Sequence, residues 1–195
     1  MQPTREQAHT LLKDAGRLNP GPWVEHSRAV ARCAQRIAAR CGLDAEKAYI
    51  LGLLHDIGRR YGVTNLKHAI DGYRYLTGLG YHEAARVCLT HSFSTKKLDD
   101  HIGKIDVTAD ELDEIMRFIQ QTAYDDYDRL IQLCDTMAGV KVVGIHARIA
   151  DIERRYNGYP NAKRDAVLAL KTYFEEKCGE NIYKVATDEK ALWGL

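Results

Sequence analysis

A histidine–aspartate pair, His55-Asp56, directly follows the strongly apolar run 51–54. Such a run is typical of the buried half of a helix. Ionisable groups placed where a core begins are costly to desolvate unless something compensates for the lost hydration. A bound cation is one such compensation, because a neutral imidazole and a carboxylate can both coordinate it. We therefore expect His55 and Asp56 to be metal ligands.

Further candidate ligands lie on other predicted helices, so the fold and not one local loop must assemble the site. These candidates are His26, His68, His91 and Asp135. A ligand set of nitrogen and oxygen favours Fe, Mn, Co, Ni or Zn over Ca or Mg, which prefer oxygen alone. The two oxygens of Asp56 could also bridge two ions about 3.5 to 4 Å apart, so we expect one or two divalent transition metal ions.

The elements that position these residues are predicted to be helices throughout. Apolar residues recur at helical spacing, and Thr4 and Thr108 each begin a capping-box pattern. The predicted helices cover about 4–14, 23–40, 44–56, 65–77, 82–91, 108–119, 124–137, 145–156 and 162–177. Adjacent helical residues point about 100° apart, so His55 and Asp56 share an ion only if their helix ends there, which Gly58 favours.

Length and composition favour a single all-α domain. The chain has 195 residues, of which 45% are hydrophobic and 28% charged, and this suits one sizeable core. We expect a helical bundle over 1–195, with the metal-site core at about 22–140 and C-terminal helices at about 145–178. The polar stretch 92–107 shows no clear period, and we expect it to be a loop able to cover the site.

Charge and cysteine content exclude several classes of partner. The formal net charge is +1 and the charges are mixed, which argues against a nucleic-acid polymer or an anionic membrane as partner. The N-terminus has no signal-type apolar region, and no segment is long enough to span a bilayer. The five cysteines are odd in number, widely spaced and without a C-x-x-C pair, which fits a reducing compartment. We expect a cytoplasmic protein.

Positive residues next to the pair are candidates for binding a phosphate group. Arg59 and Arg60 directly follow the His-Asp-Ile-Gly sequence and could act as charge-assisted donors. Lys67 is a weaker candidate of the same kind. No P-loop, Gly-x-Gly-x-x-Gly or Gly-x-Ser-x-Gly pattern points to a competing class of enzyme.

The sequence Leu-Leu-His-Asp-Ile-Gly, with a histidine one helix earlier and an aspartate well downstream, resembles the HD superfamily of metal-dependent phosphohydrolases. The resemblance covers about 22–140. It implies one metal ion held by four residues, His26, His55, Asp56 and Asp135. His68 and His91 match the additional histidines of dinuclear members, which implies a second ion, iron or manganese.

The resemblance also implies a function. We expect a metal-dependent phosphohydrolase that acts on a nucleotide or related phosphate ester or anhydride through a metal-activated hydroxide, with Asp56 bridging or orienting it and Arg59 at the phosphate. The interval from His91 to Asp135 is longer than in the members that cleave dinucleoside tetraphosphates, so the substrate stays open. Two alternatives also stay open: an HD-fold di-iron oxygenase, and a non-catalytic metal-bound regulatory or ligand-sensing domain.

Overall fold

Several helices begin at the capping residues that the sequence identifies. Thr4 and Thr108 each accept a hydrogen bond from the backbone three residues on and complete a capping box with Gln7 and Glu111. Asp44 likewise caps the helix that begins at Ala45, by accepting a hydrogen bond from Lys47 N. These side chains satisfy backbone N–H groups that a helix start leaves without partners, so the starts are determined locally.

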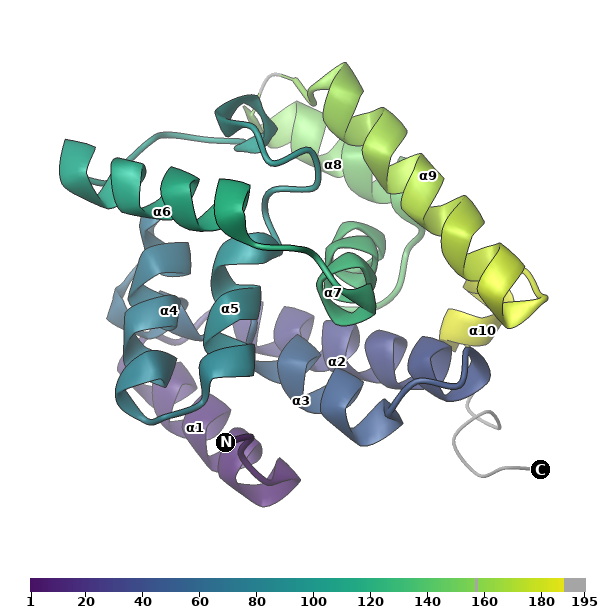
Figure 1. Ribbon diagram of the computed structural model, residues 1–195, viewed down its shortest axis with the longest axis horizontal. Helices are drawn as coiled ribbons and strands as arrows, with labels where there is room; N and C mark the ends of the chain where they lie inside the picture. Colours follow the sequence, from purple (N-terminus) through teal and green to yellow (C-terminus); the bar gives the residue numbers. More distant parts are fainter. Residues whose placement is uncertain (157, 188–195) are drawn as a thin grey trace.

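A computed structural model describes residues 1–156 and 158–187 (Figure 1). In these residues the structure is helical, and its only β-type pairing is an isolated bridge between Ala138 and Val142. The all-α prediction is therefore confirmed. The α-helices are α1 (Arg5–Leu18), α2 (Trp23–Arg40), α3 (Ala45–Leu54), α4 (Lys67–Gly78), α5 (His82–Thr90), α6 (Ala109–Gln121), α7 (Asp126–Met137), α8 (Ile145–Tyr156), α9 (Asn161–Cys178) and α10 (Ile182–Thr187). Two short 3-10 helices, η1 (Ile57–Tyr61) and η2 (Leu98–Asp100), interrupt the connections.

The main core lies between α2, α3 and α7. Helix α2 packs along α3, and α7, seen end-on near the centre of Figure 1, packs against both. Side chains such as Val30, Ile37, Leu53, Leu54 and Ile131 are fully buried in this core. Their burial removes the apolar ends of α3 and α7 from water and brings the adjoining polar residues inward.

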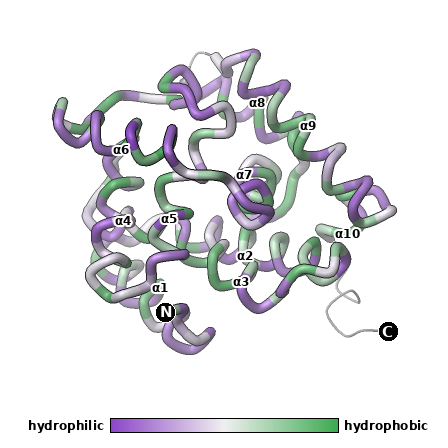
Figure 2. Tube along the Cα trace, viewed as in Figure 1, coloured by the Kyte–Doolittle hydropathy of each residue, from purple (hydrophilic) through white to green (hydrophobic). Residues whose placement is uncertain are grey.

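Helix α6 belongs to a second hydrophobic cluster on the outer side of α4 and α5. Its Ile115 and Ile119 are fully buried there, together with Phe93. In Figure 2 the trace of α6 alternates between hydrophilic and hydrophobic stretches, as expected for a helix with one covered face. This helix fills the long interval between His91 and Asp135 and covers α4 and α5 from outside.

The C-terminal helices pack onto the same main core. Ile149 of α8 and Val167 and Phe174 of α9 join the hydrophobic cluster that contains α2 and α7. Helix α10, which the sequence did not predict because it has only six residues, packs against α2. Residues 188–195 of the expected domain lie outside the described residues. None of the described helices combines the length and the apolar character that a membrane span requires.

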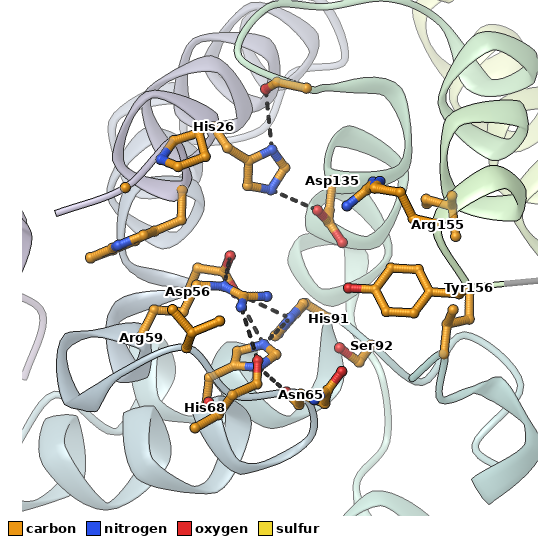
Figure 3. A pocket seen from close by; sticks show the side chains of 18 of the residues that line it. His26, Asp56, Arg59, Asn65, His68, His91, Ser92, Asp135, Arg155 and Tyr156 are labelled. Carbon is orange, nitrogen blue, oxygen red and sulfur yellow. Dashed lines mark hydrogen bonds and ion pairs between the residues drawn. The ribbon is translucent and has the colours of Figure 1, made fainter. Parts of the chain in front are cut away.

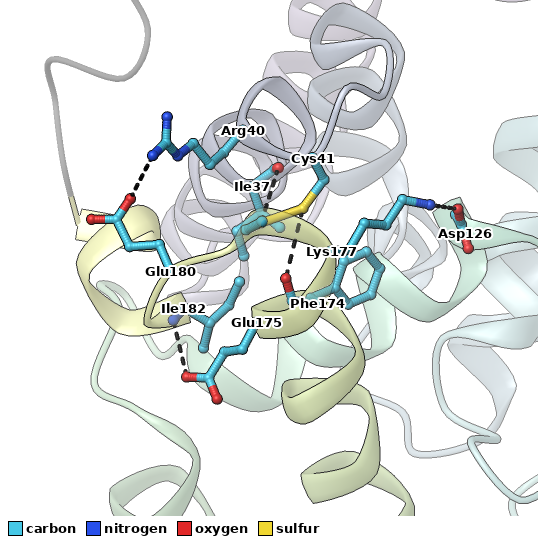
Figure 4. Close-up of a disulfide and its surroundings, with 10 residues drawn as sticks. Ile37, Arg40, Cys41, Asp126, Phe174, Glu175, Lys177, Glu180 and Ile182 are labelled. Atoms are coloured by element: carbon cyan, nitrogen blue, oxygen red, sulfur yellow. Dashed lines mark hydrogen bonds and ion pairs between the residues drawn. A yellow bond between two sulfur atoms is a disulfide. The ribbon is translucent and has the colours of Figure 1, made fainter.

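A disulfide links the ends of two helices far apart in the sequence. Cys41, just after α2, is bonded to Cys178 at the end of α9, with a sequence separation of 137 residues (Figure 4). Arg40 pairs with Glu180 beside it at 3.2 Å. The wide spacing of the cysteines suggested a reducing compartment, but spacing in the sequence does not predict distance in the fold, and this disulfide removes that argument.

Helix α3 ends at Leu54, before the histidine–aspartate pair, and η1 begins directly after it. The sequence suggested Gly58 as a residue that favours the end of the helix, but the structure gives it another role. Its backbone lies against the first turns of α4, and a Cβ atom on it would overlap the carbonyl oxygen of His68 and lie 2.5 Å from Gly72 N. Gly58 therefore permits a close approach of two backbones, which sets the position of α4 relative to the pair.

We expect Gly58→Ala to destabilise the protein by about 3 kcal/mol or more, because the added methyl group meets backbone atoms that cannot rotate away. The matched control is Gly78→Ala at the end of α4, where a Cβ meets nothing within 4 Å. Urea unfolding followed by circular dichroism measures both. Equal stability of the two variants would contradict the role of Gly58 as a packing contact.

Candidate metal centre

The six predicted metal ligands all lie at or near the ends of their elements. His26 and His68 lie in the first turns of α2 and α4, His55 and His91 directly follow α3 and α5, and Asp56 precedes η1; Asp135 lies in the last turn of α7. The structure brings all six together in one cluster. Five of them, His26, Asp56, His68, His91 and Asp135, line a pocket (Figure 3), and the fully buried His55 lies behind them. Because the ends of several helices meet at this point, six side chains can converge there from ordinary helical backbone.

Asp135 lies at one side of this cluster. Its Oδ1 atom is 2.9 Å from His26 Nε2 and 3.8 Å from His55 Nε2. The donor atoms of these three residues all lie within 4.8 Å of one another. This spacing suits a single ion, since metal–ligand bonds to nitrogen and oxygen are about 2.0 to 2.2 Å long.

Asp56 lies between two groups of histidines. Its Oδ2 atom is 3.9 Å from His55 Nε2, whereas its Oδ1 atom is 3.0 Å from His68 Nε2 and 3.8 Å from His91 Nε2. His68 Nε2 and His91 Nε2 are 3.4 Å apart. The two carboxylate oxygens thus face different imidazoles, which is the arrangement that a bridging ligand of two ions requires.

Every one of the four imidazoles has its Nδ1 atom on a backbone carbonyl. His26 Nδ1 donates to Gly139 O at 3.2 Å, and His55 Nδ1 donates to Gly52 O at 2.8 Å. His68 Nδ1 donates to Asn65 O, and His91 Nδ1 donates to Val87 O. A carbonyl only accepts, so Nδ1 carries the proton and the lone pair of Nε2 is directed into the cluster. Such outer hydrogen bonds orient histidines for metal binding.

The charges around the cluster favour the protonation states that ligands need. Burial by itself raises the pKa of Asp56, but the charge of Arg59 and the neighbouring imidazoles outweigh burial and hold that pKa well below its usual range. His26 has the same effect on Asp135, whose pKa is also far below its usual value. Burial lowers the pKa of His55, and burial together with the charge of His55 lowers the pKa of His91 to about 3.

His26 differs from these imidazoles. Burial lowers its pKa, but the hydrogen bond and charge of Asp135 outweigh burial, so the pKa is raised; the charge of Arg148 acts in the opposite sense. A proton therefore competes with a metal ion at His26 Nε2, and metal affinity falls as the pH is lowered through the pKa of this group.

One buried atom shows that the cluster fits a cation. His55 is fully buried, and its Nε2 atom has no hydrogen-bond partner. Such an orphaned acceptor costs free energy unless a ligand satisfies it. Two overlapping groups of donors share this atom: His26, His55 and Asp135 form one, and His55, Asp56 and His91 form the other.

Arg59 lies in the pocket, but part of its guanidinium is already engaged. Its Nε atom donates to Asp56 Oδ2 at 2.6 Å, and its Nη1 atom donates to Thr64 O at 3.3 Å. Arg59 therefore orients Asp56 as well as bringing a positive charge to the pocket, a role that the sequence did not suggest.

The structure does not bring Arg60 and Lys67 to the site. The guanidinium of Arg60 lies over the ring of Tyr75, 3.9 Å from its centroid, and Lys67 pairs with Asp71 at 2.7 Å and with Glu111 at 3.2 Å. Neither lines the pocket. The prediction that they bind substrate is therefore not supported, because η1 turns Arg60 away from Arg59 and α4 turns Lys67 away from His68.

The pocket has a volume of about 620 Å³ and is lined by residues that sequence reasoning missed. Residues of the loop 92–107 contribute one side, as expected, including Ser92, His101 and Ile102. The opposite side comes from α8, α9 and their connection, with Arg148, Arg155, Tyr156, Tyr159 and Lys163. No local pattern marks these residues, because their elements reach the pocket only through tertiary packing.

Lys163 connects the two sides. Its Nζ atom donates to Ser92 O and to Asp100 O, both at 2.8 Å. Ser92 directly follows His91, so α9 holds the backbone next to a candidate ligand. Burial lowers the pKa of Lys163, although the charges of Asp100 and Asp135 partly oppose this.

Comparison with known proteins agrees with this geometry. The HD domain family matches residues 23–139, which is more than half of the chain. A ribonuclease Y from Chlorobaculum tepidum is 45% identical over 53 residues, which cover 27% of this chain and 10% of that protein. No solved structure matches the sequence. The chain belongs to the HD domain family.

Proposed function

We propose that this protein is a metal-dependent phosphohydrolase that acts on a nucleotide or a related phosphate ester or anhydride. The observation that carries the proposal is the convergence of four Nε2 atoms and two ionised carboxylates in one cluster at the pocket. The family, whose members are mostly metal-dependent hydrolases, supports the same reading.

We assign the donor side chains to two metal ions. In our proposal His26, His55, Asp56 and Asp135 hold one ion, and His68 and His91 hold a second with Asp56 between them. The opposite orientation of the two Asp56 oxygens supports this division. When bound, divalent ions of this kind activate a water molecule as nucleophile and stabilise negative charge on phosphoryl oxygens.

The residues of the chain supply position and charge for the substrate. Arg59 keeps Asp56 ionised and oriented through its 2.6 Å contact. Arg59, Arg148, Arg155 and Lys163 are the cationic residues outside the ligand set that line the pocket, and Asp151 is the one acidic residue there, among the residues that the structure describes. This excess favours an anionic substrate such as a phosphate compound.

A purified protein loaded separately with Mn²⁺, Fe²⁺ or Co²⁺ tests the proposal. Phosphate release is measured on nucleoside mono- and polyphosphates, cyclic and dinucleotides, and a short RNA, which is included because of the name of the ribonuclease Y relative. Turnover of at least one nucleotide is expected. Oxygen consumption without phosphate release would identify the oxygenase alternative, and tight binding without any turnover would identify the sensing alternative.

His55→Ala and Asp56→Ala are expected to abolish both bound metal and hydrolysis. His55 Nε2 belongs to both groups of donors, and Asp56 offers one oxygen to each of the two proposed ions. Metal content is measured by elemental analysis, with the exposed His146→Ala as control. Loss of metal can itself destabilise the domain. The isosteric Asp56→Asn variant is therefore measured alongside, with circular dichroism. Unchanged metal content in a folded Asp56→Asn and His55→Ala would refute the site.

The number of ions is tested at His68 and His91. Each alanine variant should lose about half of the bound metal, because the residues around Asp135 can still hold one ion. Elemental analysis of the wild type should accordingly give a ratio near two metal ions per chain under saturating metal. Full metal content in both variants would show that these histidines are structural.

Arg59→Ala should lower kcat/KM by about 10- to 100-fold, since a charge-assisted hydrogen bond contributes about 1.5 to 3 kcal/mol. Arg59→Lys should recover only part of this loss, because an ammonium lacks the planar fork of a guanidinium. The control is Arg60→Ala, whose side chain lies outside the pocket. Wild-type kinetics for Arg59→Ala would remove Arg59 from the active site.

A further inference from the structure

One face of α8 forms a wall of the pocket. The residues of this wall are Arg148, Asp151, Ile152, Arg155 and Tyr156. They lie three, four, seven and eight residues after Arg148, which places them on one side of the helix. Figure 3 shows Arg155 and Tyr156 across the pocket from Arg59 and Asp56. This wall lies outside residues 23–139, the part of the chain that the HD domain family matches.

A single carboxylate holds the two arginines of this wall. Asp151 Oδ2 accepts from Arg148 Nη1 at 3.2 Å and from Arg155 Nη2 at 2.7 Å. Two guanidinium groups thus share one carboxylate at the pocket, which leaves an excess positive charge. The Nε atom of Arg148 is buried and has no hydrogen-bond partner, so its donor capacity is unused.

The other cations of the pocket are already engaged. Arg59 is bound to Asp56 and to a backbone carbonyl, and Lys163 is bound to two backbone carbonyls. Arg148 and Arg155, by contrast, each have one hydrogen bond, to Asp151, and the buried Nε atom of Arg148 is without a partner. Helix α8 therefore offers donors that a ligand in the pocket could use. A volume of about 620 Å³ also exceeds what one phosphate group at the metal centre would fill, and lies in the usual range for small-molecule sites.

We propose that Arg148 and Arg155 form a second anion subsite, which binds a phosphate group other than the one that is cleaved. Asp151 holds the two guanidinium groups in place before the ligand arrives. The inference rests on the proposed function for the identity of the pocket, and it narrows the substrate to compounds with at least two phosphate groups, such as nucleoside di- or polyphosphates.

The test compares inorganic phosphate with pyrophosphate, which avoids any assumption about the base. Metal-loaded protein is freed of unbound metal, and both affinities are measured by calorimetry, with metal content determined before and after. The wild type should bind pyrophosphate at least about 10-fold more tightly than phosphate, the gain expected from charge-assisted hydrogen bonds to a second group. Arg148→Ala and Arg155→Ala should each remove most of this preference.

Arg154→Ala is the matched control. Arg154 lies on the same helix and also pairs with Asp151, at 3.4 Å, but it is 73% exposed and does not line the pocket. It should keep the preference for pyrophosphate. If the Arg148→Ala variant unfolds, Arg148→Gln is measured in its place. Arg155→Lys should keep only part of the preference for pyrophosphate, because an ammonium lacks the planar fork of a guanidinium.

The outcomes separate the subsite from the hydrolase. No preference in the wild type, or an unchanged preference in both arginine variants, overturns the subsite even if the protein hydrolyses nucleotides. An equal loss in Arg154→Ala overturns it as well, because general charge would then explain the binding. A preference that depends on Arg148 and Arg155 supports the subsite, even if no phosphate compound is hydrolysed.

Discussion

The candidate metal site depends on one kind of interaction. In each of its four histidines, Nδ1 donates a hydrogen bond to a backbone carbonyl. It ties four side chains to main-chain atoms, so their Nε2 atoms are directed by the backbone and not by flexible rotamers. The cost is that several acceptor atoms meet in a buried place. His55 Nε2 is left there without a partner, and a bound cation would satisfy it.

Helix ends place these hydrogen bonds in space. The candidate ligands lie in first turns, in last turns or directly after helices, where the chain turns and side chains can point along the helix axis. The close backbone contact of Gly58 with α4 sets the distance between the His55-Asp56 pair and His68. The buried ends of α3 and α7 bring Asp135 to the same place through ordinary apolar packing.

The C-terminal helices form one wall of the pocket. The family match ends at residue 139, yet one wall of the pocket and the contact of Lys163 with the backbone beside His91 come from residues 148–163. The candidate metal ligands thus lie inside the matched range, whereas this wall lies outside it.

The sequence by itself identified α1 to α9 and the candidate ligands, but not the short α10. Caps and helical periodicity act over a few residues, so Thr4, Asp44 and Thr108 predict helix starts without knowledge of the fold. The His55-Asp56 pair follows an apolar run, so the sequence alone shows that these groups are costly to desolvate and need a partner such as a metal ion. The exact helix ends were less certain, and α3 stops two residues earlier than predicted.

Only the tertiary structure decided which other residues reach the site. Arg59 faces the pocket and its neighbour Arg60 does not, because a single residue step in η1 turns a side chain to another direction. Arg148, Lys163 and the bonding of Cys41 to Cys178 depend on contacts between elements far apart in the chain. Such contacts follow from the packing of whole helices, which no local pattern of residues encodes.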